Sequence, residues 1–294
     1  MISFIIPCLN EEESLQMLYD GIVSNTRSDY EIIFIDDGST DKSVDLIRQL
    51  HEKDNKVRLI MFRKNFGKAA ALQAGFQNCS GDIVITMDAD LQDEPTEINN
   101  FIDKINEGYD VVSGWKMVRN DPLEKTLPSK LFNKVVSWQS GVKIHDFNCG
   151  YKAYRSEVVK SISLYGDLHR YIPVLANRKG FKITEIPVQH NPRKFGKSKY
   201  GMERYLRGLF DSMSVVYLSK YYDRPMHFFG RLGLLSGFRI CNMSLSIDSL
   251  GTGSSNWRQT SVNAWCSRNH NRHTIFLDWF NMRHAFGLLF QITI

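Results

Sequence analysis

The chain has 294 residues, of which 43% are hydrophobic and 23% charged, a balance that supports a sizeable core and excludes a wholly disordered chain. Its net charge of +5 suits an anionic ligand or a membrane surface, but it is too small and too dispersed to indicate nucleic-acid binding. The five cysteines lack metal-binding spacing and are typical of a reducing compartment, and the first residues show no secretory signal.

The first 115 residues repeat one pattern, in which an apolar, β-rich run is followed by an amphipathic stretch. This pattern predicts strands at residues 2–7, 31–36, 57–62, 82–87 and 110–115. Helices are predicted between them, one capped by Asn10, one capped by Ser39 or Thr40, one over residues 68–78 and one after Pro95. Such alternation predicts an α/β fold with a doubly wound, mainly parallel sheet covered by helices on both faces.

The pattern changes after residue 128. A helix is predicted at 130–139, a short strand and a helix after the segment DFNCGYK, and a strand at 180–188 that ends at Pro187. A basic loop at 190–200 and a long helix at 202–222 follow. We expect one domain over residues 1–225 and a separate C-terminal segment over residues 226–294.

Polar residues follow each of the first four predicted strands. Because the carboxyl ends of parallel strands lie at one edge of a sheet, where ligands of such sheets bind, these residues predict a site. The triplet Asp88-Ala89-Asp90, followed by Gln92, is its strongest element, since two carboxylates in extended backbone point the same way and can reach one hard cation. A solvated turn that caps the next helix is the alternative.

Asp37 is the second candidate, as a carboxylate that meets the base or ribose of a nucleotide or that caps a helix after a glycine turn. Pro7 and Glu11 would form the opposite wall of the site. The chain has neither a Walker lysine motif nor a GxGxxG segment after its first strand, so neither a P-loop nor a dinucleotide fold is favoured. The basic loop suits a phosphate, although a charge run is usually a solvated face.

Seven segments together resemble a family 2 glycosyltransferase of GT-A fold: IPCLNEEESL, IDDGSTD, RKNFGKAAALQAG, MDADLQDEP, DFNCGYKAYR, HRYIPVLA and PVQHNPRKFGKSKYG. More narrowly, they resemble the polyprenyl-phosphate sugar transferases, the group that includes dolichol-phosphate mannose synthase and bacterial undecaprenyl-phosphate glycosyltransferases. The resemblance extends from Ile2 to about Leu235.

This resemblance implies a metal-dependent, inverting transfer of a sugar from a nucleotide-diphosphate sugar to an undecaprenyl or dolichyl phosphate in cell-envelope synthesis. It places the enzyme at the cytoplasmic face of the cell membrane. For the nucleotide, the resemblance implies Pro7, Asn10, Glu11, Asp37, Lys68 and Asp88, and for Mg²⁺ or Mn²⁺ it implies Asp88, Asp90 and Gln92. For the phosphates of donor and acceptor it implies Arg193, Ser198 and Lys199, and Asp146 is the implied acceptor-side acid. The implied catalytic residues are Asp90, Asp146, Arg193 and Lys199.

The chemical class of the acceptor remains open at this point. A lipid phosphate is already ionised near neutral pH and needs no strong base, whereas Asp146 would serve as a base if the acceptor were a sugar hydroxyl. The alternatives are therefore a family 2 transferase that acts on a hydroxyl in polysaccharide synthesis, or an inactive, truncated product that binds nucleotide. A sugar-nucleotide nucleotidyltransferase would need a glycine-rich signature near the first strand, which is absent.

The C-terminal part departs from the family. From Ser236 onward the chain has no Lys, Glu or Pro, where the resemblance leads us to expect two hydrophobic hairpin helices. We attribute this change to a shift of reading frame near codons 236–241, which translation of the gene in the other frames would test. The helix with Leu206, Leu209 and Phe210 along one side would then either make the membrane contact as a peripheral segment or pack on the sheet domain.

Overall fold

The computed structural model describes residues 1–117, 133–134, 136–138, 140–166, 168–189 and 191, with residues 230 and 233 in addition. Four predictions therefore lie outside the described residues: the helix at 202–222, most of the basic loop, the domain boundary near residue 225 and the altered C-terminal segment. Within the described part of the chain, no helix is long and apolar enough for a bilayer crossing.

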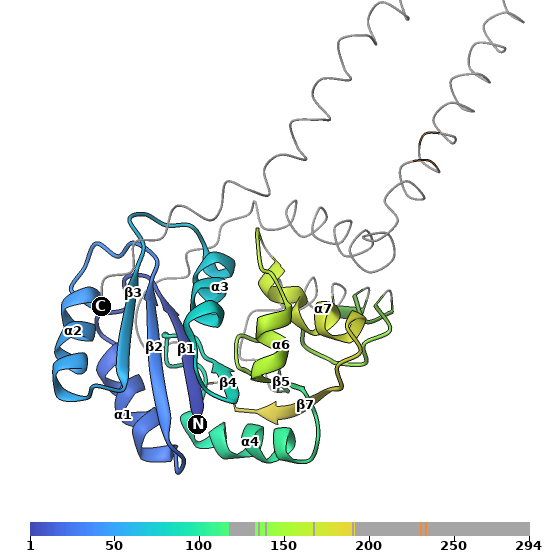
Figure 1. The fold of residues 1–294 in the computed structure, drawn as a ribbon, viewed down its shortest axis with the longest axis horizontal. Helices are drawn as coiled ribbons and strands as arrows, with labels where there is room; N and C mark the ends of the chain where they lie inside the picture. The colour runs from blue at the N-terminus through green and yellow to red at the C-terminus, as the bar shows by residue number, and fades with distance from the viewer. Residues whose placement is uncertain are drawn as a thin grey trace, which may run out of the picture. The chain divides into compact units, whose positions relative to one another are not determined.

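The described elements alternate between strands and helices as the sequence predicts (Figure 1). In chain order they are β1 (Ile2–Cys8), α1 (Leu15–Asn25), β2 (Tyr30–Asp36), α2 (Ser43–Lys53), β3 (Val57–Met61), α3 (Lys68–Asn78), β4 (Ile83–Thr86), the 3₁₀ turn η1 (Pro95–Glu97), α4 (Ile98–Asn106), β5 (Val111–Lys116), β6 (Lys152–Arg155), α6 (Ser156–Ser161), η2 (Leu168–Tyr171), α7 (Ile172–Arg178) and β7 (Ile183–Val188).

The described strands form one seven-stranded sheet in the order β3-β2-β1-β4-β6-β5-β7. Every neighbouring pair is parallel except the two pairs that include β6, which runs antiparallel to both β4 and β5. The chain winds outward from β1 through β2 to β3 and then returns to β4 on the other side of β1. The carboxyl ends of β1 and β4 therefore flank the point where the winding direction reverses, which is where open α/β sheets bind ligands.

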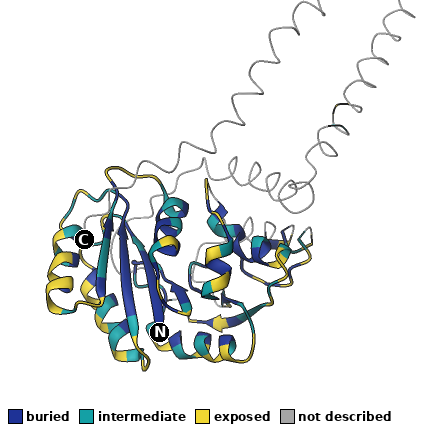
Figure 2. Cartoon of the chain, in the orientation of Figure 1, coloured by how far each residue is buried: buried dark blue, intermediate teal, exposed yellow. Residues whose placement is uncertain are grey.

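Two hydrophobic cores cover the two faces of the sheet, because successive side chains of a strand point to opposite faces. On β1, Phe4 and Ile6 pack with α1, α2 and α4, while Ile5 packs on the opposite face with α3, α6 and α7. The strands are the most deeply buried elements and the helices bury one side each (Figure 2). The prediction of a doubly wound sheet with helices on both faces is confirmed.

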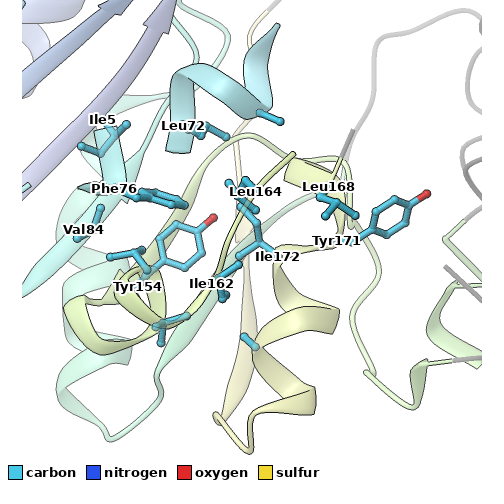
Figure 3. Close-up of a cluster of buried hydrophobic side chains, with 14 of the residues drawn as sticks. Ile5, Leu72, Phe76, Val84, Tyr154, Ile162, Leu164, Leu168, Tyr171 and Ile172 are labelled. Carbon is cyan, nitrogen blue, oxygen red and sulfur yellow. The ribbon is translucent and has the colours of Figure 1, made fainter. Parts of the chain in front are cut away.

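The core on the α3 side reaches from the sheet to the segment after β6 (Figure 3). Phe76 of α3 meets Tyr154 of β6 edge to face, with ring centroids 5.7 Å apart. Leu164 and Leu168 continue this cluster toward Ile172 of α7. Apolar packing therefore anchors the 168–172 segment beside α3, whose first residue belongs to the site described below.

Two predicted helix caps are wrong. Asn10 does not cap α1, which begins at Leu15 after Ser14; its backbone has a φ of 52° and its side chain turns to the loop after β2. Neither Ser39 nor Thr40 caps α2, which begins at Ser43. In both places the polar side chains hold two loops together, and this tertiary contact replaces the local cap.

The strand predicted to end at Pro187 also differs in its limits. β7 begins at Ile183 and continues through Pro187 to Val188. Proline is tolerated there because β7 is the last strand of the described sheet, and an edge strand has one side on which no backbone donor is needed.

Candidate active site

The ends of β1, β2 and β4 come together at one edge of the sheet. Cys8 is in register with Asp36, and the backbone N–H of Asp37 donates to the carbonyl of Cys8 at 2.9 Å. On the other side of β1, Ile5 is in register with Thr86. The polar segments that follow these strands are therefore neighbours in space, as the parallel sheet predicts.

The segment after β1 is fastened to the segment after β2. The side-chain oxygen of Asn10 accepts from the backbone N–H of Thr40 at 2.8 Å, and the N–H of Asn10 donates to Ser39 Oγ at 2.9 Å. The N–H of Glu11 donates to Ser43 Oγ at 3.0 Å. Asn10 and Glu11 thus stand on a rim that the loop before α2 holds in place, and Pro7 lies within β1 just before this rim.

Asp37 joins the end of β2 to the start of α3. Its two carboxylate oxygens accept the backbone N–H groups of Phe66 at 2.7 Å and Gly67 at 2.9 Å. Burial raises the pKa of Asp37, and these two hydrogen bonds oppose that rise. Gly67 has a φ of 91°, a conformation that glycine adopts without strain, and Lys68 follows as the first residue of α3. Asp37 therefore determines where the side chain of Lys68 begins.

Lys68 and Asp88 form an ion pair across the site, in which the ammonium donates to Asp88 Oδ1. Burial by itself would raise the pKa of Asp88, but the charge and hydrogen bond of Lys68 outweigh burial and lower that pKa to about 2. Asp88 is consequently ionised at neutral pH. The position attracts positive charge, which is the first requirement of a cation site.

Asp90 and Gln92 lie in a tight turn after β4 and not in the extended backbone that the sequence analysis assumed. Residues 89–90 form the turn, Leu91 has a φ of 58°, and Asp90 Oδ1 accepts from the N–H of Gln92 at 3.2 Å. The assumption failed because β4 ends at Thr86, before Asp88, and the chain turns at residues 89–90. Gln92 also pairs with Asn191, whose N–H donates to its carbonyl at 3.0 Å.

The donor set of this turn fits a hard divalent cation. Asp88, Asp90 and Gln92 offer two carboxylates and an amide oxygen, the ligand types that Mg²⁺ prefers. No three His, Cys, Asp or Glu side chains gather into a metal-holding group anywhere in the described ranges. A cation here would therefore rest on the carboxylates of the turn together with oxygens from outside the protein.

Asp93 and Lys116 form an ion pair behind the turn that the sequence analysis did not single out. Lys116 Nζ lies 3.2 Å from Asp93 Oδ1, and Asp93 Oδ2 accepts from the N–H of Asp88 at 3.3 Å. Burial would lower the pKa of Lys116, but the charge of Asp93 outweighs it and raises that pKa. The sequence alone could not predict this pair, because the two residues are far apart in the chain and only the fold brings the turn to the end of β5.

The turn of residues 146–150 closes the site on the side of β6. Asp146 is buried, and its carboxylate accepts from the N–H of Asn148 at 3.0 Å. The buried ammonium of Lys152 donates to the carbonyls of Phe147 and Cys149, which fastens the turn. Burial lowers the pKa of Lys152. Asp146 was predicted, whereas the role of Lys152 depends on a contact that no local pattern reveals.

Gly150 packs directly against Asp88. A Cβ atom added to Gly150 would stand 2.6 Å from Asp88 Oδ2, closer than real Cβ contacts allow. The hydroxyl of Thr86 donates to the Gly150 carbonyl at 2.8 Å and holds this contact. The 146–150 turn and the carboxylate of Asp88 therefore touch.

A small hollow, with room for about one water molecule, lies between α3 and the 146–152 turn. Its polar lining includes Lys68, Lys152, Arg170 and His169, so three cations surround it. Burial and the neighbouring charges of Lys68 and Arg170 lower the pKa of His169 to about 3, and His169 Nδ1 is buried without a hydrogen-bond partner. The segment HRYIPVLA marked this region in the sequence, but it assigned no role to His169 or Arg170.

The predicted residues fall into two groups. The structure brings together the end of β1, the loops after β2 and before α3, the turn after β4 and the turn before β6, which carry these predicted residues: Pro7, Asn10, Glu11, Asp37, Lys68, Asp88, Asp90, Gln92 and Asp146. The three predicted residues of the basic loop, Arg193, Ser198 and Lys199, lie outside the described residues.

Comparisons with curated proteins identify relatives over most of the chain. A dodecaprenyl-phosphate galacturonate synthase of Rhizobium johnstonii is 36% identical over 241 residues, which cover 79% of this chain and 71% of the relative. An undecaprenyl-phosphate 4-deoxy-4-formamido-L-arabinose transferase of Edwardsiella ictaluri is 34% identical, with coverage of 81% and 74%.

Solved structures share the fold at low sequence identity. Glucosyl-3-phosphoglycerate synthase of Mycobacterium tuberculosis, in complex with Mn²⁺, UDP and phosphoglyceric acid, matches with a TM-score of 0.56 and 18% identity over 74% of this chain and 78% of its own. The same enzyme with Mg²⁺ and UDP matches with a TM-score of 0.56 and 20% identity over 72% and 79%. The family model of glycosyl transferase family 2 matches residues 3–163. With these relatives and this fold, the chain belongs to glycosyl transferase family 2 and is a glycosyltransferase.

Proposed function

We propose that this enzyme transfers a sugar from a nucleotide-diphosphate sugar to a polyprenyl phosphate, with a divalent cation, Mg²⁺ or Mn²⁺, at the donor diphosphate. The observation that carries the acceptor class is the similarity, over about four fifths of the chain, to relatives named for dodecaprenyl- and undecaprenyl-phosphate. The donor class is supported by the polar edge at the point where the sheet reverses its winding.

The residues at the edge of the sheet are proposed to bind different parts of the donor, according to where each residue lies. Asn10, Glu11 and Asp37 stand on the rim beside β1 and β2 and are proposed to bind the nucleoside. Asp88, Asp90 and Gln92 would hold the cation, which would supply Lewis-acid stabilisation of the charge on the departing diphosphate. Lys68 lies beside Asp88 and would donate to the diphosphate oxygens.

The acceptor phosphate has to be oriented toward the donor sugar, and it does not need a base to remove a proton. A lipid phosphate attacks as an anion, so the chief obstacle is to bring two anionic groups into line. Arg193, Ser198 and Lys199 are proposed to bind these phosphates. Asp146 is buried and accepts from the Asn148 N–H, a contact that suits a residue that shapes the acceptor turn. We propose attack opposite the leaving group, with inversion at the anomeric carbon.

The acceptor places the reaction at a membrane surface, since a polyprenyl chain remains in the bilayer. We propose that the enzyme works at the cytoplasmic face of the cell membrane, in cell-envelope synthesis. A net charge of +5 is compatible with an anionic surface.

The test uses the full chain, labelled nucleotide sugars, Mn²⁺ and two acceptors, detergent-solubilised undecaprenyl phosphate and free sugars. We expect transfer to the lipid phosphate only, and a loss of about 100-fold or more in Asp88→Asn, which weakens charge stabilisation of several kcal/mol. Arg193→Ala and Lys199→Ala should also lose transfer to the lipid. Lys179→Ala, at an exposed lysine after α7, is the matched control and should remain active.

Two results would contradict this proposal. Transfer to free sugars in place of the lipid phosphate would show that the acceptor is a hydroxyl. Undiminished transfer by Asp88→Asn would exclude a role for that carboxylate in binding a cation.

A further inference from the structure

Lys68 is held so that its ammonium reaches Asp88. Asp37 fixes the two backbone N–H groups that precede α3, and Gly67 supplies the positive-φ backbone from which Lys68 starts. The Lys68 and Asp88 side chains are 28% and 32% exposed, so their pair lies at the surface of the site, where a ligand can reach it. In the free chain, Lys68 therefore supplies positive charge at the carboxylate that the proposed function gives to a divalent cation.

The positive charges around Lys68 oppose the movement of its ammonium away from Asp88 when no other anion is present. The pocket that Lys68 lines also contains Lys152 and Arg170, and His169 is kept neutral there. Lys152 already donates to two backbone carbonyls of the 146–150 turn. An ammonium that moved off Asp88 into this pocket would face like charges, and it needs an anion to offset their repulsion.

A nucleoside diphosphate is such an anion. Its arrival beside Asp88 gives the Lys68 ammonium an alternative partner with more negative charge than one carboxylate, while Asp88 becomes free to bind a metal ion. Charge-assisted hydrogen bonds to phosphate oxygens are among the stronger polar contacts of proteins, so this exchange is favourable only when the diphosphate is present.

We propose that Lys68 is the resident counter-ion of Asp88, and that its transfer to the donor diphosphate makes the binding of the divalent cation and of the diphosphate interdependent. This inference rests on the proposed function and extends it to the order of events at the site. By linkage, the factor by which the diphosphate tightens cation binding equals the factor by which the cation tightens diphosphate binding.

The experiment measures binding to the full chain without any sugar transfer. Mn²⁺ affinity is measured from the electron paramagnetic resonance signal of free Mn²⁺, and the affinities of labelled UDP and GDP are measured by equilibrium dialysis with and without Mn²⁺. Uridine and guanosine are the probes without a diphosphate. The variants are Lys68→Met, Lys68→Arg, which keeps the charge, and Lys64→Met, which removes an exposed lysine that lies over the Phe66 ring in the same loop.

In the wild-type chain we expect Mn²⁺ alone to bind weakly, and a nucleoside diphosphate to tighten it by a factor within the roughly 5- to 150-fold range of typical couplings. Lys68→Met should bind Mn²⁺ alone about three- to tenfold more tightly, because no ammonium competes for Asp88, and should lose most of the coupling. Lys68→Arg and Lys64→Met should retain the coupling, and the nucleosides should show none.

The inference is overturned if Lys68→Met binds Mn²⁺ no more tightly than wild type, or if it keeps the full coupling. Circular dichroism establishes that the variant is folded, and Lys68→Gln replaces it if it is not. Failure of Mn²⁺ to bind any variant, with or without nucleotide, would overturn the cation site as well. Coupling without transfer to a polyprenyl phosphate would support the inference and refute the proposed acceptor, so the two failures are distinct.

Discussion

The substitution Asp37→Asn tests whether this carboxylate organises the start of α3. Asp37 is 6% exposed, and each of its oxygens accepts one backbone N–H, from Phe66 at 2.7 Å and from Gly67 at 2.9 Å. An asparagine keeps one acceptor oxygen and places an NH₂ group opposite the second N–H. The variant therefore loses one hydrogen bond to a charged group and weakens the other.

The size of the effect follows from these two contacts. Hydrogen bonds to charged groups contribute about 1.5–3 kcal/mol each, and neutral ones about 0.5–1.5 kcal/mol. Part of this loss is offset, because burial raises the pKa of Asp37 and so already disfavours its charged form. We expect the free energy of unfolding of Asp37→Asn to fall by about 2 kcal/mol. Nucleotide binding should weaken as well, because Lys68 follows this loop.

Urea denaturation measures the free energy of unfolding, and dialysis with labelled UDP and GDP measures nucleotide affinity. Asp29→Asn is the matched control, since this exposed carboxylate pairs with Lys56 on the surface and should change neither quantity measurably. A fall below about 0.5 kcal/mol for Asp37→Asn, similar to ordinary surface substitutions, would refute the role assigned to the two hydrogen bonds.

Three further predictions concern pH, packing and metal. Burial raises the pKa of Glu31, but hydrogen bonds and the charge of Arg58 outweigh it and lower that pKa, so the folded chain binds fewer protons here than the unfolded chain. This contribution to stability is present above the pKa that Glu31 has in the unfolded chain, and it is lost as the pH falls through the pKa of Glu31 in the folded chain. Urea titrations should show that Glu31→Gln is about 1–3 kcal/mol less stable than wild type at pH 7. The difference should be smaller near pH 3.5. In Gly150→Ala the added Cβ displaces the Asp88 carboxylate, so dialysis should show weaker Mn²⁺-dependent nucleotide binding, and wild-type affinity would contradict the contact. Chelation of divalent cations should abolish sugar transfer in a labelled assay and Mn²⁺ should restore it; persistent transfer in excess chelator would rule out metal dependence.

Local sequence predicted helices and strands well where side-chain periodicity or helix propensity decides them. α3 has the predicted limits, residues 68–78, because its sequence is rich in Ala, Leu and Gln, which favour the helix. The caps were predicted wrongly because the side chains of Asn10 and Ser39 have two possible partners, their own helix or the neighbouring loop. The paired loops of β1 and β2 supply the second partner, and only the fold determines that choice.

In the candidate site, too, some residues could be predicted from the sequence and others only from the fold. The rim residues were predictable because parallel strands bring their carboxyl ends to one edge, so order along the chain is enough to bring Asp37 and Asp88 to that edge. The Asp93–Lys116 pair and the buried Lys152 were not predictable, since each depends on a contact between segments with no shared local pattern.

The sequence by itself determined the α/β alternation, the buried strands and the polar edge, since hydrophobic period and turn chemistry are local properties of the chain. Only the tertiary structure decided that β6 inserts antiparallel between β4 and β5, and that the turn before it presses Gly150 against Asp88. Strand pairing and charge balance depend on residues far apart in sequence, and their energies are realised only when the sheet has formed.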